Sequence, residues 1–209
     1  CSQISPTSCP MRTSIIPIPV LAVALQACTT EPELLNSERI EQTFGSYGIQ
    51  VLQNDQQLRR SELYSLENGT KVCRTYALVQ FQAATNVRTR DEHASILDGA
   101  SIGETFKSAG WRIYKQTLYI GSITPASPDA DVLQMMRLDD TQELAMHVYQ
   151  LLIEKEDVAL EYATIVEVHH PDYLAESELR DLFPVSESSL LSEDEVTAIV
   201  SLVLPPQNH

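Results

Sequence analysis

The sequence predicts an α+β fold in which a mainly antiparallel sheet is flanked by short helices, all in a single domain. Three observations predict it. Two strand-like runs meet at Asn68-Gly69, a dipeptide that favours the tight turn of a β-hairpin. Further strand-like stretches follow in the second half of the chain. Helical spacings of apolar residues stand at both ends of the domain and between the strands.

The first part of the domain contains two kinds of pattern in alternation. Ser37 precedes a helix because Ile40 and Phe44 lie four residues apart and so share one helical face. Gly45 and Gly48 then interrupt this helix. The expected elements are a helix over 38–44, a short strand over 49–52, hairpin strands over 63–66 and 71–82, and two short helices over 91–98 and 102–109.

The middle of the chain is dominated by strand patterns. Residues 111–123 alternate between apolar and polar side chains, with a bend expected near Gln116, and residues 125–131 are expected to form a loop. The window 144–153 fits both a helix spacing and an alternating strand. We favour the strand, because a turn after it would form a hairpin with the strongly strand-like residues 158–169.

The end of the domain is predicted to be helical. A short helix is expected over 177–183, where Pro184 stops it. Ser192 and Glu195 have the spacing of a capping box, in which each side chain bonds the other residue's backbone N–H. A second helix therefore begins after Ser192 and ends before Pro205.

The start of the chain has the composition of an export signal. Met11 is the first methionine, and we expect translation to begin there, so that residues 1–10 are an upstream extension. Arg12 supplies a positive charge, residues 15–25 form an apolar run, and Cys28 follows shortly after. A membrane-spanning helix needs about 20 apolar residues, so this run is too short to remain as an anchor.

Leu25-Gln26-Ala27-Cys28 resembles the lipobox of bacterial lipoproteins. The resemblance implies that signal peptidase II cuts before Cys28 and that Cys28 carries the lipid that anchors the protein to a membrane. Thr29 stands where an Asp would signal retention in the inner membrane, so the resemblance implies the periplasmic face of the outer membrane. The chain then divides into an upstream extension (1–10), a signal peptide (11–27), a tether (28–36) and a single acidic α+β domain (37–209).

Charge and cysteine content narrow the class further. The net charge is −15, and residues 121–209 carry 3 basic and 18 acidic residues, whereas residues 28–120 carry 10 and 11. Such a protein lacks the Lys and Arg residues that nucleic-acid binding needs, so we exclude that partner. The acidic half is expected to form a solvated face, or alternatively a surface for a basic partner. Cys73 is expected to be a buried, inert thiol without a disulfide partner. The alternative is a reactive thiol beside Arg74.

Ser101 is the candidate nucleophile of a hydrolase motif. Residues 99–103 fit the pattern G-x-S-x-G, which in hydrolases places a serine on a sharp strand-to-helix turn. Asp157 followed by His169 or His170 would supply the other members of a triad. The alternative is structural: Ser101 and Glu104 would cap the helix over 102–109, and Gly99 would end the preceding helix in a left-handed conformation. We favour the alternative.

A metal site is conceivable at the end of the strand over 158–169. Glu167 and His169 would point to one face of the sheet and His170 to the other, and His147 would join the first pair from the neighbouring strand. Imidazole and carboxylate are zinc ligands, but the spacing lacks a recognised metal pattern, so we favour hydrogen-bonded histidines.

A third cluster interleaves aromatic and basic residues, as carbohydrate- or polymer-binding strands do, yet it also fits plain cross-strand pairing. It comprises Trp111, Arg112, Tyr114, Lys115 and Tyr119.

The expected role is that of a lipid-anchored bacterial envelope protein with a non-catalytic binding or scaffolding domain. Its expected partners are the membrane, through Cys28, and an envelope protein or ligand that the sequence does not identify. No cofactor is expected. The alternative is an envelope hydrolase that depends on Ser101 or on a metal held by His147, Glu167 and His169.

Overall fold

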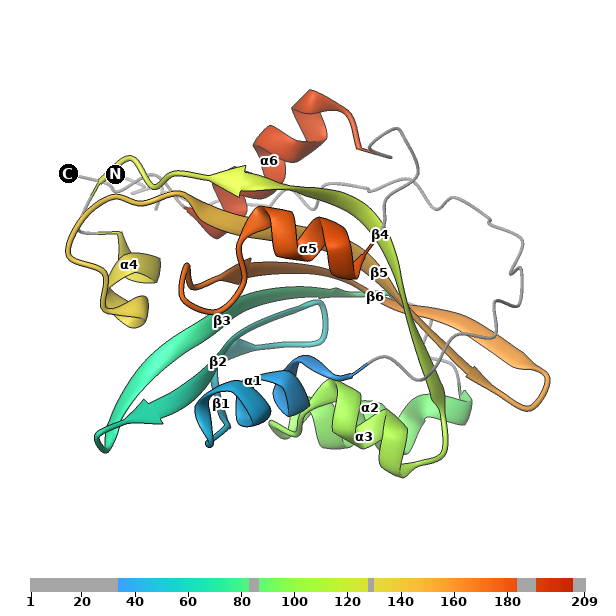
Figure 1. Cartoon of the computed structure of the whole chain (residues 1–209). Helices are drawn as coiled ribbons and strands as arrows, with labels where there is room; N and C mark the ends of the chain where they lie inside the picture. Colours follow the sequence, from blue (N-terminus) through green and yellow to red (C-terminus); the bar gives the residue numbers. More distant parts are fainter. Residues whose placement is uncertain (1–33, 83–86, 128–129, 184–190, 205–209) are drawn as a thin grey trace, which may run out of the picture.

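A computed structural model describes residues 34–82, 87–127, 130–183 and 191–204. Its centre is a six-stranded antiparallel sheet with strand order β1-β2-β3-β6-β5-β4 (Figure 1). The strands are β1 (Gly48–Asn54), β2 (Leu58–Glu67), β3 (Thr70–Phe81), β4 (Arg112–Ile123), β5 (Leu144–Lys155) and β6 (Val158–His169). The predicted fold class is therefore confirmed. In these described ranges, no helix has both the length and the apolar content needed to cross a membrane.

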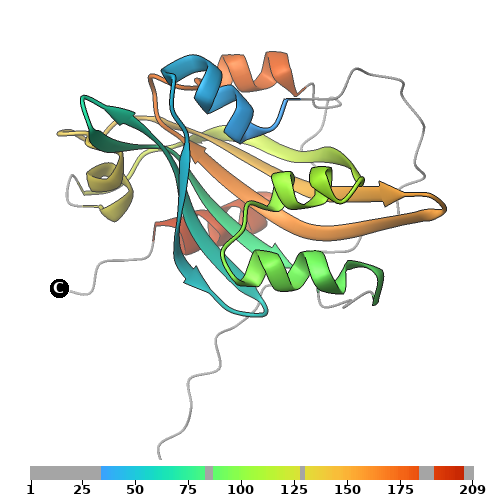
Figure 2. The ribbon, with the colours of Figure 1, turned by 90° about the horizontal axis from the view of Figure 1, so that it is seen from below.

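Helices cover both faces of the sheet, giving three layers. One face carries α4 (Asp131–Met136) and α6 (Glu193–Val203). The opposite face carries α1 (Asn36–Phe44), α2 (Arg90–Leu97), α3 (Ile102–Ser108) and α5 (Glu176–Leu182), and a 3₁₀ turn over Val87–Thr89 leads into α2. Figure 2 shows α2 and α3 in front of the sheet, with α6 behind it.

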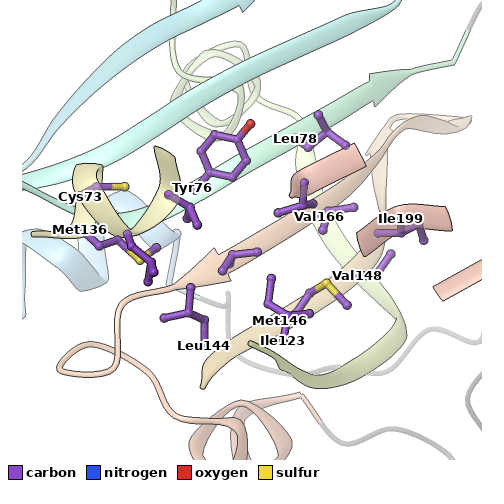
Figure 3. Close-up of a cluster of buried hydrophobic side chains, with 14 of the residues drawn as sticks. Cys73, Tyr76, Leu78, Ile123, Met136, Leu144, Met146, Val148, Val166 and Ile199 are labelled. Atoms are coloured by element: carbon purple, nitrogen blue, oxygen red, sulfur yellow. The ribbon is translucent and has the colours of Figure 1, made fainter. Parts of the chain in front are cut away.

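The face under α4 and α6 has one continuous hydrophobic core (Figure 3). Side chains of β3, β4, β5 and β6 point into it, and Ile199 and Val203 of α6 cover it. Members shown in Figure 3 include Tyr76, Leu78, Met146, Val148 and Val166. Cys73 lies in this core with no exposed surface, and burial raises the pKa of its thiol, as expected for an inert cysteine.

The opposite face has two separate hydrophobic clusters. One lies beneath α2 and α3 and contains Val79, Phe106 and Ile165. The other lies beneath α1 and α5 and contains Ile40 and Leu63. The sheet between the two clusters carries small and polar side chains, namely Ser61, Ala77 and Glu167. The two clusters therefore do not merge.

Most of the predicted elements are present. Residues 144–153 form a strand, paired with β4 and β6 along its length. Asn68 and Gly69 both have positive φ, 50° and 77°, as the predicted tight hairpin requires. The predicted bend near Gln116 appears as an irregularity of register between Thr117 and Tyr119. The Ser192–Glu195 capping box is also present.

The structure differs from expectation at three places. Strand β2 begins at Leu58, five residues before the expected start of that strand at Leu63. The first helix begins at Asn36, so Leu35 and Asn36 belong to the packed domain and not to the tether. Helix α4 was not predicted, because it begins where the loop over 125–131 was expected to end and is only one and a half turns long. The leader, Cys28, Pro184 and Pro205 lie outside the described residues.

Candidate functional site

A cavity of about 90 Å³ lies where the two clusters fail to merge, between the sheet and the first residues of α1 and α3. The row of side chains across the sheet explains it. Ser61 of β2 is paired with Ala77 of β3, which is paired with Glu167 of β6. Two neighbouring small side chains leave a hollow that the helices above do not fill.

The cavity has mainly apolar walls and a few polar groups. The apolar walls come chiefly from Leu35, Leu63, Val79, Ile102, Ile113 and Ile165. The charged side chains that reach it are Arg59, Lys115 and Glu167. An apolar pocket with a small number of convergent polar groups is the usual form of a small-molecule site.

Glu167 is held by a hydrogen-bonded network that ties α1 to the sheet. The residue is 5% exposed, and its Oε1 accepts a bond of 3.1 Å from Asn36 Nδ2. Asn36 Nδ2 also donates to Thr75 Oγ1 at 3.2 Å, and Asn36 Oδ1 accepts from the Tyr173 hydroxyl at 2.5 Å. The first residue of α1 therefore determines where that helix sits over the cavity.

His147 and His169 flank Glu167 as neutral imidazoles. His169 shares a hydrogen bond of 3.0 Å with Thr75, and its Nε2 lies 3.9 Å from Glu167 Oε2. Burial lowers the pKa of His169 to about 4, although Glu167 acts in the opposite direction. Burial also lowers the pKa of His147 to about 2, with Lys115 and His169 adding to the effect, and its ring stacks on Phe183.

The structure brings the three predicted metal ligands to one face but does not arrange them as a ligand set. His147 is the register partner of Glu167, and His169 lies two residues further along the same strand. His147 Nε2 is bonded to Thr117 at 3.0 Å. Within the described ranges, no three His, Cys, Asp or Glu side chains are placed to hold a metal ion. His170 lies on the other side, as predicted, bonded to Met136 at the end of α4.

Ser101 lines the cavity at the start of α3. The predicted cap is wrong: the Ser101 side chain makes no capping bond to the helix. Gly99 does adopt the predicted left-handed conformation, with φ of 109°. Ser101 lies near the Tyr47 hydroxyl instead, where it partly offsets the burial and the charge of Glu104 that raise the pKa of Tyr47 to about 12.

The proposed partners of Ser101 do not form a triad. Asp157 precedes β6 and His169 ends it, so the two residues are roughly 40 Å apart along an extended strand. Among the described residues that line the cavity there is no histidine. Among the described residues of the cavity, Ser101 therefore has no histidine that could serve as its general base.

Arg59 is the feature that the sequence analysis missed. Its side chain is 1% exposed and lines the cavity. Nη1 donates to the carbonyl oxygens of Ile96 at 3.0 Å and Ala100 at 2.7 Å, and Nη2 donates to that of Gly99 at 3.4 Å. These bonds hold the connection between α2 and α3, and burial lowers the pKa of Arg59. The one local sign in the sequence is that Arg59 alternates with Ser61 and Leu63, as residues on one face of a strand do.

The aromatic and basic cluster is used for packing. Trp111 is buried against Phe106, and its Nε1 donates to Glu92 at 2.9 Å. Arg112 pairs with Glu154 on the neighbouring strand, and Lys115 lies over the rings of Tyr149 and Phe183. These contacts fit the cross-strand interpretation. Lys115 is the member of the cluster that also reaches the cavity.

Comparison with known proteins adds no relative: the chain matches no protein-family model, no curated protein and no solved structure.

Proposed function

We propose that this protein is a lipid-anchored bacterial envelope protein whose α+β domain is a non-catalytic binding module for a small ligand. The observation that carries the binding role is the cavity between the sheet and helices α1 and α3. Its apolar walls would bury a ligand, and its few polar groups would orient it.

The anchor is supported by the order of residues before the domain. A positive residue, a short apolar run and Cys28 follow one another in the arrangement of a lipoprotein signal. Helix α1 begins at Asn36, so the segment between Cys28 and the domain is short. At up to about 3.6 Å per residue, it would hold the domain within roughly 30 Å of the lipid.

A non-catalytic role is supported by the state of the reactive groups. Ser101 has no histidine beside it among the described residues of the cavity, and His147 and His169 are buried and neutral. Ser101 does line the cavity, so hydrolysis remains the alternative that the experiments below address.

Intact mass spectrometry tests the anchor. We expect the chain expressed in a Gram-negative host to be cut before Cys28 and to carry the added mass of acyl chains. The Cys28→Ala variant should lose both changes and leave the outer-membrane fraction. An uncut chain without acyl mass would contradict the proposed location.

Native mass spectrometry tests the binding role independently of the anchor. Protein taken intact from the host envelope in mild detergent should carry a small molecule, and Ala77→Leu, which fills the floor of the cavity, should lose it. A matched Ser101→Ala variant should retain the ligand and its mass. If wild-type protein hydrolyses short acyl esters and Ser101→Ala does not, the hydrolase alternative is correct.

A further inference from the structure

We propose that the cavity takes a monocarboxylate with a short apolar tail, and that the carboxylate binds at the Nε edge of Arg59. This inference rests on the binding role proposed above and gives that role a ligand class. Three independent features of the cavity carry it: the hydrogen bonding of Arg59, the volume and apolar walls, and the placement of the charges.

The guanidinium of Arg59 is satisfied on one side only. Its three hydrogen bonds all use Nη1 and Nη2 and all go to backbone carbonyl oxygens at or next to the α2–α3 connection. Nε is buried, and among the described residues no acceptor lies within hydrogen-bond distance of it. The bond from Nη2 to Gly99 is the longest of the three, at 3.4 Å. The edge formed by Nε and Nη2 is therefore the part of Arg59 that can still bind a carboxylate through two parallel bonds.

Burial of this cation also favours an anion. In the part of the chain that the structure describes, no acidic side chain forms an ion pair with Arg59, although the residue is 1% exposed. A buried charge without a counter-charge is unfavourable, and neutral carbonyls offset only part of that cost. A bound carboxylate would supply the missing negative charge within a short distance of the guanidinium.

The cavity sets the size and character of the rest of the ligand. Its volume is about 90 Å³, whereas one water molecule occupies about 30 Å³ in the liquid. Room for about three waters restricts the ligand to a small molecule with a short tail. Val79 and Ile165 continue the row that begins at Arg59, so the tail beside the carboxylate would lie on apolar side chains.

The remaining charges are placed compatibly with an anion at Arg59. Lys115 brings a second positive charge to the cavity. Glu167 is the negative group there, but it lies two strands and two residues away from Arg59 in the register of the sheet. The spacing of strands and residues separates their Cα atoms by about 12 Å. Glu167 also accepts a bond from Asn36, which disperses part of its charge.

Equilibrium dialysis of labelled butyrate and butyramide tests the proposal. The two probes have the same number of non-hydrogen atoms and differ in charge. Intact wild-type protein in mild detergent should bind butyrate at least roughly tenfold more tightly than butyramide, a ratio that corresponds to one charge-assisted contact. Arg59→Met should abolish this preference.

Two further variants keep the test interpretable if Arg59→Met does not fold. Ala77→Leu retains Arg59 but fills the cavity, so it should lose butyrate binding. Arg60→Met is the matched control: Arg60 is adjacent in sequence but bonds to Tyr76 and Leu202 on the opposite face, and this variant should bind butyrate like the wild type.

The outcomes separate this inference from the function on which it rests. Equal binding of both probes, lost in Ala77→Leu, would overturn the carboxylate assignment while supporting a binding cavity. Binding of butyrate that survives Ala77→Leu would place the anion elsewhere and overturn the proposal. Binding of neither probe would also overturn it; the binding role itself would then fail only if native mass spectrometry finds no cavity-dependent ligand.

Discussion

His147 and His169 show how burial and the lack of hydrogen-bond acceptors decide the chemistry of a residue. Each imidazole has one nitrogen bonded to a threonine, Thr117 or Thr75, and one buried nitrogen without a hydrogen-bond partner among the described residues. A charged imidazole would need two acceptors and access to water, and neither ring has them. Both histidines are therefore neutral packing residues near neutral pH, and this state weighs against their use as acids.

These histidines predict a loss of stability in mild acid. Their pKa values in the folded protein, about 2 and about 4, lie below the ordinary value of 6.5 that they regain on unfolding. Above pH 6.5 neither state binds the proton, so they contribute no pH dependence. As the pH falls below 6.5, only the unfolded chain is protonated, and each histidine lowers the unfolding free energy by about 1.4 kcal/mol per pH unit. For His169 this continues to about pH 4.

Urea unfolding between pH 7.5 and pH 5 measures this effect. Carboxylates with lowered pKa values, such as Glu38 and Glu176, act at more acidic pH. Burial also lowers the pKa values of His93 and His170, so the contribution of His169 is measured as the difference between wild type and variant. His169→Asn, which keeps a polar group beside Thr75, should reduce the slope by about 1.4 kcal/mol per pH unit. A wild-type stability that is constant over the range would show that the rings take up protons in the folded state.

At the scale of elements, local sequence patterns predict the strands and most of the helices, but not α4. The alternation over 158–169 and the Asn68-Gly69 turn are local signals, and the structure confirms both. Alternation also placed His147, Glu167 and His169 correctly on one face. Helix α4 has no comparable signal, because a helix of six residues depends on its packing partners and not on its own sequence.

The cavity could not be predicted, because it arises between elements that are distant in the chain. Ser61 and Ala77 are unremarkable in sequence, and only the pairing of β2 with β3 makes them neighbours. Arg59 was missed for a related reason. Its carbonyl partners come from the α2–α3 connection about forty residues later, and no local pattern indicates that contact.

The side chain of Asn36 ties the start of α1 to the sheet. Asn36 has three hydrogen bonds, to Thr75, Glu167 and Tyr173, and it connects the helix to β3, β6 and the segment before α5. Asn36→Ala leaves Glu167 and the Tyr173 hydroxyl without these partners in a largely buried site. We expect it to lower the free energy of unfolding by about 2–4 kcal/mol.

Chemical denaturation at pH 7.5 measures this loss, with Thr43→Ala as the control. Thr43 is an exposed residue of the same helix, and its hydroxyl bonds only to the helix's own backbone. Its replacement should change stability by less than about 0.5 kcal/mol. Equal effects of the two variants would mean that α1 is held by its apolar face through Ile40 and not by Asn36.

At the scale of the whole molecule, the uneven charge has a structural counterpart. The acidic second half supplies both β5 and β6 in the centre of the sheet and the helices α4, α5 and α6. Its carboxylates lie mainly at strand turns and helix starts, including Glu156 and Asp157 between β5 and β6 and Glu193, Asp194 and Glu195 at the start of α6. Few basic residues of this half offset them, so the folded domain concentrates like charge on its surface.

This concentration predicts that salt stabilises the fold. Folding brings the carboxylates closer together than they are in the unfolded chain, and the repulsion is long-range at low ionic strength. The screening length falls from about 30 Å at 0.01 M to about 8 Å at 0.15 M, so added NaCl should remove most of the repulsion. We expect the unfolding free energy to rise by about 1 kcal/mol over that range at pH 7.5, and the Glu156→Gln, Asp157→Asn double variant to show a smaller rise.

Exposed ion pairs such as Arg112–Glu154 and Arg180–Glu176 act in the opposite direction, but each contributes little. A stability that falls with salt would show that these attractions, and not the net charge, dominate the electrostatics of the folded domain.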